Sequence, residues 1–90
     1  MATPKTILII DHDDDLREAL AEQLALHEEF RPVQASTATD GVRQAREVRA
    51  DLILLDVDLP DMDGREACRL IRKAGVSTPV IMLTAQSSGS

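Results

Sequence analysis

The hydrophobic positions of this chain form short continuous runs, and longer stretches with helical spacing lie between them. Three runs, 7–10, 52–55 and 80–83, are apolar at every position, and a weaker run covers 33–35. Apolar runs that do not alternate with polar residues are typical of strands buried on both faces of a parallel sheet. The sequence therefore predicts four strands in one such sheet.

The first helical pattern follows the first strand. Its apolar residues recur at helical spacing: Leu16, Ala19, Leu20 and Leu24. Asp15 and Glu18 stand at the spacing of a capping box, in which two side chains bond the free backbone N–H groups of a first turn. We therefore expect a helix that begins near Asp15 and buries the leucine face.

Two more helices are expected, a weaker one over 40–48 and a clearer one after Asp63. Asp63 is the predicted N-cap of the clearer helix, and Gly75 is its predicted end. The apolar face of this helix consists of Ala67, Leu70, Ile71 and Ala74. Strands that alternate with helices indicate an α/β fold with right-handed crossovers between parallel strands.

The composition is that of a globular domain, because 43% of the 90 residues are hydrophobic and the net charge is −6. This acidic balance argues against direct nucleic-acid binding, which needs a basic surface. Cys68 is the only cysteine, no stretch is long enough to span a membrane, and the chain start lacks a signal peptide. We expect a cytoplasmic domain over 1–86 and a flexible tail over 87–90.

Polar residues follow the three fully apolar strands: Asp11, Asp56 and Thr84. If the strand order is 2-1-3-4, they meet at the carboxyl edge of the sheet, where ligands bind in folds of this class. Carboxylates about 4 Å apart repel by roughly 4 kcal/mol at an effective dielectric near 20, so a cation is expected there. Mg²⁺ prefers oxygen ligands and would fit phosphoryl chemistry. Asp61 and Asp63, in contrast, are explained by a turn and a helix cap.

Three stretches resemble the receiver domain of bacterial two-component response regulators: "ILIIDHDDDLREAL", "DLILLDVDLPDMDGREACRLIR" and "TPVIMLTA". They stand in the order and at the spacing of that family, and the OmpR-like branch of transcription factors fits best. The resemblance implies a flavodoxin-like (receiver) open parallel sheet with strand order 2-1-3-4. It also implies a phosphoacceptor domain, not an enzyme, that takes a phosphoryl group from a histidine kinase with Mg²⁺ as cofactor.

The resemblance also implies roles for individual residues. Asp56 would accept the phosphoryl group as an acyl phosphate, and Thr84 would donate its hydroxyl to the phosphoryl oxygens. Asp11, Asp56 and the backbone carbonyl of Asp58 would hold Mg²⁺. The loop after Asp56 would be shaped by Pro60 and Gly64.

This chain departs from the family pattern in two respects. His12 stands where the family has a second acid that binds the metal, and imidazole suits softer metals than Mg²⁺. Either His12 or Asp13 is then the candidate for a further metal ligand. The family also has a last helix-strand-helix unit, with a lysine that pairs with the phosphoryl group, and this unit is not matched within residues 1–90.

We therefore expect a truncated receiver whose phosphorylation and signal output are impaired. The strand over 80–83 would be an open edge, and each apolar side chain left in water there would forfeit about 1.5–3 kcal/mol. An open edge also pairs readily with another chain. The expected state is a homo-oligomer formed through this strand and the uncovered faces, with DNA binding only through a C-terminal domain of the parent protein.

Two other functions fit part of the pattern. Asp56-Val57-Asp58 after a buried strand resembles the D-x-D motif of haloacid dehalogenase-type phosphatases, in which Asp58 would be the general acid. Pro60, and the place of the motif on the third strand instead of the first, argue against this enzyme. His12 and the unmatched lysine favour a pseudo-receiver, an interaction module without phosphoryl chemistry.

Overall fold

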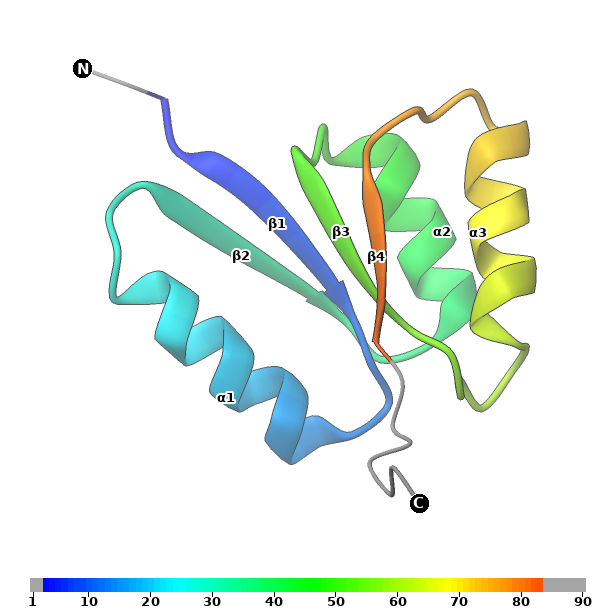
Figure 1. The fold of residues 1–90 in the computed structure, drawn as a ribbon, viewed down its shortest axis with the longest axis horizontal. Helices are drawn as coiled ribbons and strands as arrows, with labels where there is room; N and C mark the ends of the chain where they lie inside the picture. Colours follow the sequence, from blue (N-terminus) through cyan, green and yellow to red (C-terminus); the bar gives the residue numbers. More distant parts are fainter. Residues whose placement is uncertain (1–2, 84–90) are drawn as a thin grey trace.

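Strands and helices alternate along residues 3–83, the part of the chain that this computed structural model describes (Figure 1). The elements are β1 (Lys5–Ile10), α1 (Asp14–Ala25), β2 (Phe30–Ala35), α2 (Ala38–Glu47), β3 (Leu52–Asp56), α3 (Gly64–Lys73) and β4 (Val80–Leu83). The strands form a four-stranded sheet in the order β2-β1-β3-β4, and all neighbours are parallel. The predicted open parallel sheet with strand order 2-1-3-4 is therefore confirmed.

β2 is longer than the weak apolar run in the sequence. It covers Phe30–Ala35 and includes Pro32, which lies opposite Ile7 of β1. Proline has no backbone N–H to donate, so within sheets it is found mainly on edge strands. β2 is an edge strand of this sheet, which explains how Pro32 is accommodated.

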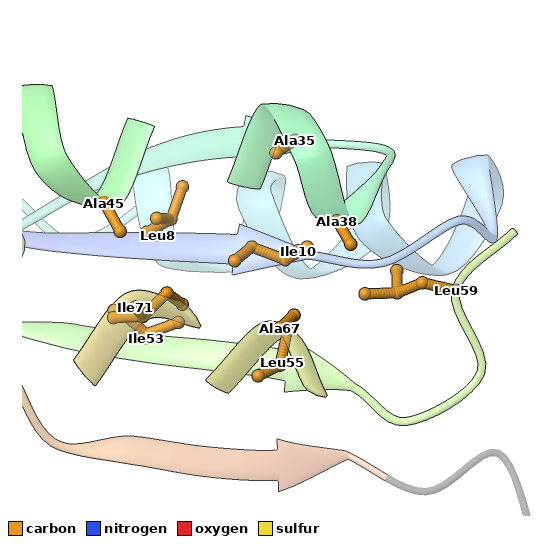
Figure 2. Close-up of a cluster of buried hydrophobic side chains, with 10 residues drawn as sticks. All are labelled: Leu8, Ile10, Ala35, Ala38, Ala45, Ile53, Leu55, Leu59, Ala67 and Ile71. Carbon is orange, nitrogen blue, oxygen red and sulfur yellow. The ribbon is translucent and has the colours of Figure 1, made fainter. Parts of the chain in front are cut away.

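The larger hydrophobic core lies between the sheet and the pair α2 and α3 (Figure 2). Its buried side chains are all aliphatic: Leu8, Ile10, Ala35, Ala38, Ala45, Ile53, Leu55, Leu59, Ala67 and Ile71. Alternate residues of β1 and β3 belong to this core, because successive side chains of a strand point to opposite faces. α2 packs closely on the sheet at Gly41, where a Cβ would collide with Ile10.

α1 covers only part of the opposite face. It packs on β1 and β2 (Figure 1), where Ile7 and Ile9 are buried against Ala21. Leu54 of β3 is only half-buried, and Ile81 of β4 is 51% exposed. The β3 and β4 half of this face is therefore the least covered part of the described sheet.

The start of α1 differs from the expected one. Asp13 is the N-cap, and its side chain accepts a hydrogen bond from the backbone N–H of Leu16 at 3.1 Å. The predicted capping box that begins at Asp15 is therefore wrong. Of the predicted face, Leu20 and Leu24 pack against the cluster of Ile7, Ile9 and Ala21. Leu16, however, is 45% exposed, and Arg17 is buried with its side chain donating to Gln34 of β2.

The predicted ends of α3 are confirmed. Asp63 caps the helix by accepting a backbone hydrogen bond from its first turn, and Gly75 follows the helix with φ 91°, a conformation that glycine adopts without strain. Ala67 and Ile71 of the predicted face are buried, while Ala74 is exposed. No helix among residues 3–83 is long and apolar enough to cross a membrane.

Candidate metal and phosphoacceptor site

The carboxyl ends of β1 and β3 bring two aspartates together. Asp11 directly follows β1, and Asp56 is the last residue of β3. The strands are parallel neighbours with Ile10 opposite Leu55, so the next residue of each strand lies at the same edge of the sheet. Both aspartates are buried, with 3% and 2% of their surface exposed. Thr84, the third residue predicted at this edge, lies outside the described residues.

His12 completes a cluster with these aspartates. Its Nδ1 lies 2.9 Å from Oδ2 of Asp56. Each of Asp11, His12 and Asp56 offers one possible ligand atom, and these atoms lie within 4.8 Å of one another. The hydrogen bond with the Asp56 carboxylate raises the pKa of His12. The imidazole side chain is 49% exposed, so the cluster is open to solvent on this side.

The surroundings of Asp11 oppose its ionisation. Burial raises the pKa of Asp11, and the neighbouring Asp56 carboxylate adds to this effect, against a hydrogen bond from the Asp13 backbone that lowers it. Two ionised carboxylates about 5 Å apart repel by roughly 3 kcal/mol at an effective dielectric near 20. A bound cation would remove this repulsion.

Asp13 has a structural role instead of a place in the cluster. Its backbone N–H donates to Oδ1 of Asp11 at 2.9 Å, and its side chain caps α1 at Leu16. Of the two residues considered as the further metal ligand, the structure brings His12 to Asp11 and Asp56, while the Asp13 carboxylate is engaged by the helix.

The loop after β3 holds the Asp56 carboxylate in place. The backbone N–H of Asp58 donates to Oδ1 of Asp56 at 3.0 Å, and the N–H of Gly64 donates to the carbonyl of Val57 at 2.7 Å. A Cβ at Gly64 would collide with the carbonyl oxygen of Asp56, so the start of α3 packs this closely only with glycine. This geometry supports the predicted role of Gly64 and keeps the backbone of Asp58 beside the site.

Arg17 supports the site, and the sequence patterns missed it. It is 8% exposed, its Nη1 donates to the backbone carbonyl of Asp11 at 2.9 Å, and its Nε donates to Oε1 of Gln34 at 2.9 Å. Arg17 therefore ties the loop after β1 to β2 and puts a positive charge near the acidic cluster. The sequence signal that could have identified Arg17 is its helical spacing from Leu20 and Leu24.

Asp61 caps a helix that is distant in the sequence. Its carboxylate accepts hydrogen bonds from the backbone N–H groups of Ala38 and Thr39, both at 2.8 Å, and from the Thr39 hydroxyl at 2.7 Å. These bonds, the hydroxyl bond foremost, lower the pKa of Asp61 to about 2. A turn role alone is therefore an incomplete description, because Asp61 joins the β3–α3 loop to the start of α2.

The donor atoms of the cluster fit a hard cation only in part. Asp11 and Asp56 supply carboxylate oxygens, which are the ligands that Mg²⁺ prefers. His12 supplies an imidazole nitrogen, which suits Zn²⁺ and later transition metals better than Mg²⁺.

A parallel α/β sheet with a buried acidic cluster at the carboxyl ends of adjacent strands is the arrangement of domains that bind ligands at this edge. The sequence profile of the response regulator receiver domain matches residues 7–90, and the chain belongs to this family. Receiver domains generally bind Mg²⁺ in an acidic pocket, and this chain has an acidic cluster of Asp11, His12 and Asp56. Family membership argues against the haloacid dehalogenase-type alternative.

Individual relatives agree with this assignment. The chain is 43% identical over 82 residues to the transcriptional regulatory protein AfsQ1 of Streptomyces coelicolor, covering 91% of this chain and 36% of that protein. It is 37% identical over 90 residues to response regulator MprA of Mycobacterium sp. strain KMS, covering 97% and 37%. The crystal structure of a CheY-like receiver domain protein from Methanospirillum hungatei superposes with a TM-score of 0.86 at 30% identity, covering 96% and 68%. The chain thus spans little more than a third of the length of AfsQ1 and of MprA.

Proposed function

We propose that Asp56 is the phosphoacceptor of this receiver domain and takes its phosphoryl group from a histidine kinase. The observation that supports this most is the burial of Asp56 at the end of β3, within a cluster that contains Asp11 and His12. The relatives include a protein named as a transcriptional regulator, so the proposed parent protein is a cytoplasmic transcription regulator. DNA binding would then belong to another part of that parent.

In the proposed reaction, a carboxylate oxygen of Asp56 attacks the phosphorus atom of phosphohistidine. A P–O bond forms, the P–N bond breaks, and the electron pair stays with the kinase imidazole. The N–H of Asp58 fixes the rotamer of the attacking carboxylate through Oδ1, and Arg17 fixes Asp11 beside it. Each domain would accept one phosphoryl group, so it acts as a substrate of the kinase and not as a turnover enzyme.

A divalent cation, when bound, would neutralise charge on the phosphoryl oxygens and on the carboxylates. In this chain Asp11, Asp56 and the backbone carbonyl of Asp58 would hold it. Thr84 would donate its hydroxyl to the phosphoryl group, and this role stays a prediction because Thr84 lies outside the described residues.

Intact mass after incubation with acetyl phosphate and Mg²⁺ tests the proposal. We expect one added phosphoryl group on a fraction of the unchanged chain and none on Asp56→Asn. Asp58→Asn is the matched control, because it keeps the backbone carbonyl and N–H, and we expect it to be labelled. Continuous turnover of p-nitrophenyl phosphate that Asp58→Asn abolishes would contradict the proposal in favour of a phosphatase. Absence of labelling would favour the pseudo-receiver, which the contact between His12 and Asp56 makes the second candidate.

We also propose that the 90-residue polypeptide by itself forms a homo-oligomer through β4. Within residues 3–83, β4 pairs only with β3, and Ile81 is 51% exposed on the poorly covered face. Light scattering should show a dimer or larger species, and a cooperatively unfolding monomer would refute this. We also expect acetyl phosphate to label Asp56 incompletely in this 90-residue polypeptide. The comparison is with a chain extended to the length of the solved receiver domains.

A further inference from the structure

We propose that His12 makes the acidic pocket selective for imidazole-binding transition-metal cations, such as Co²⁺ and Zn²⁺, over Mg²⁺. The inference rests on the proposed cation site at Asp11 and Asp56 and assigns the ion that this particular chain prefers. It starts from the position of Nδ1 of His12, which faces Oδ2 of Asp56 at 2.9 Å. A cation bound between these atoms would have one nitrogen ligand and carboxylate oxygens.

Asp13, the other acid near the pocket, does not supply an oxygen ligand in place of the His12 nitrogen. The Asp13 carboxylate accepts the hydrogen bond of Leu16 at 3.1 Å and thereby caps α1, while the Asp13 backbone N–H is bonded to Asp11. Turning the Asp13 side chain toward the pocket would leave α1 without its N-cap, which destabilises the start of the helix. His12 is therefore the third side chain of the pocket.

Both the charge and the donor type then disfavour Mg²⁺. With His12 neutral, the three side chains carry two negative charges, whereas an acid at this position would give three. Affinity for hard cations such as Mg²⁺ falls with fewer anionic oxygen ligands. The affinity of an imidazole-containing site rises from Mn²⁺ through Fe²⁺, Co²⁺ and Ni²⁺ to Cu²⁺, and such a site also binds Zn²⁺ well.

Binding at Nδ1 requires a simple proton rearrangement. In the hydrogen bond to Asp56, the neutral imidazole carries its proton on Nδ1. When the cation takes this position, the Nδ1 proton moves to Nε2 through solvent, or is released to solvent where the ring is charged, and no oxidant or further reactant is needed. Because the side chain is 49% exposed, Nε2 can exchange this proton with water.

Competition titrations of Mg²⁺ against Co²⁺ test the selectivity in the unchanged chain, His12→Asp and His27→Asn. His27 is the only other histidine, so His27→Asn controls for binding elsewhere. We expect His12→Asp to tighten Mg²⁺ binding and to lower the ratio of Co²⁺ to Mg²⁺ affinity, each on the order of tenfold. His27→Asn should match the unchanged chain. Because Cys68 is the only thiol, Cys68→Ser should also leave the ratio unchanged.

Proton NMR of the Co²⁺-loaded chain provides a readout that does not depend on phosphorylation. Ring protons of His12 should show large paramagnetic shifts that His12→Asp removes and His27→Asn retains. Equal affinity ratios in the unchanged chain and His12→Asp would overturn the inference, as would shifted signals from His27 alone. If Asp56 is still labelled by acetyl phosphate with Mg²⁺ in that case, the inference fails while the proposed function stands. If no divalent ion binds at Asp11 and Asp56, both fail.

Discussion

Two pairs of aspartates near the carboxyl edge of the sheet differ in their burial and in their surroundings. Asp11 and Asp56 are buried, and burial together with their proximity raises the pKa of Asp11. Asp61 and Asp63 are exposed. A hydrogen bond from Arg65 foremost lowers the pKa of Asp63, and the bonds at the start of α2 lower that of Asp61. Negative charge on Asp11 therefore opposes folding, whereas negative charge on Asp61 and Asp63 favours it.

The comparison separates the binding pocket from the scaffold that holds it. Parallel strands place the buried pair, and the raised pKa of Asp11 means that its negative charge is disfavoured there, an effect that a bound cation would offset. The exposed pair caps α2 and α3 and thereby fixes the loop that carries Asp58. Substitutions that remove charge should consequently change stability with opposite signs in the two pairs.

The largest expected effect is at Asp56. In the absence of divalent cations, Asp56→Asn should raise the free energy of unfolding by about 1–3 kcal/mol, because it removes the repulsion with Asp11. Urea denaturation with EDTA measures this. Asp58→Asn is the control for charge alone, since the Asp58 side chain is exposed, and should change stability little.

Adding Mg²⁺ should change the stability difference between the unchanged chain and Asp56→Asn. A ligand that binds only the folded state stabilises it, so Mg²⁺ should stabilise the unchanged chain more than Asp56→Asn. An Asp56→Asn variant that is less stable than the unchanged chain in EDTA would show that the buried pair does not oppose folding.

The next effect is at Asp61. Asp61→Ala removes the acceptor of two backbone N–H groups at the start of α2 and should lower the free energy of unfolding by about 1 kcal/mol, the usual contribution of a hydrogen bond. Asp61→Asn is the intermediate variant, because its amide keeps one acceptor oxygen and loses the other, and it should retain part of the stability. Equal losses in the two variants would assign the effect to charge instead of to hydrogen bonding.

The smallest expected effect is the contribution of Asp61 to the pH dependence of stability. The pKa of Asp61 is lowered from 3.8 to about 2, so its carboxylate contributes stability above pH 3.8 that is lost as the pH falls toward 2. Solvent screening at this exposed position limits the loss to less than about 1 kcal/mol. Asp61→Asn should lack this part of the acid destabilisation.

Asp11 should show the opposite sign. Its pKa is raised in the folded state, so protonation of Asp11 favours folding as the pH falls. Thermal unfolding midpoints between pH 5 and pH 2, compared among the unchanged chain, Asp61→Asn and Asp11→Asn, measure both contributions. The same pH profile in the unchanged chain and Asp61→Asn would contradict the role of Asp61.

Much of the fold could be predicted because its signals are local. Apolar runs without alternation identified the parallel strands, and strand ends identified Asp11 and Asp56 as neighbours. The cap at Asp63 and the stop at Gly75 also depend on nearby residues alone. The helix ends require no knowledge of how distant segments pack, whereas placing Asp11 beside Asp56 depended on the strand order 2-1-3-4 expected for this fold class.

The features that were missed depend on contacts between distant segments. Asp61 and the start of α2 are bonded across 22 or more residues, and Arg17 reaches Gln34 in β2. The N-cap of α1 was missed as well, although the hydrogen bond from Leu16 to Asp13 is local. The contact of His12 with Asp56 likewise appears only when β1 and β3 are adjacent.

The most direct test of the central claim is NMR observation of backbone amides during titration with beryllofluoride, a stable mimic of the phosphoryl group, in the presence of Mg²⁺ or Co²⁺. The proposed phosphoacceptor site predicts shifts concentrated at Asp11, His12, Asp56 and Asp58 in the unchanged chain, and their loss in Asp56→Asn. Absence of these shifts with both ions, or identical shifts in Asp56→Asn, would contradict a phosphoacceptor site at the carboxyl ends of β1 and β3.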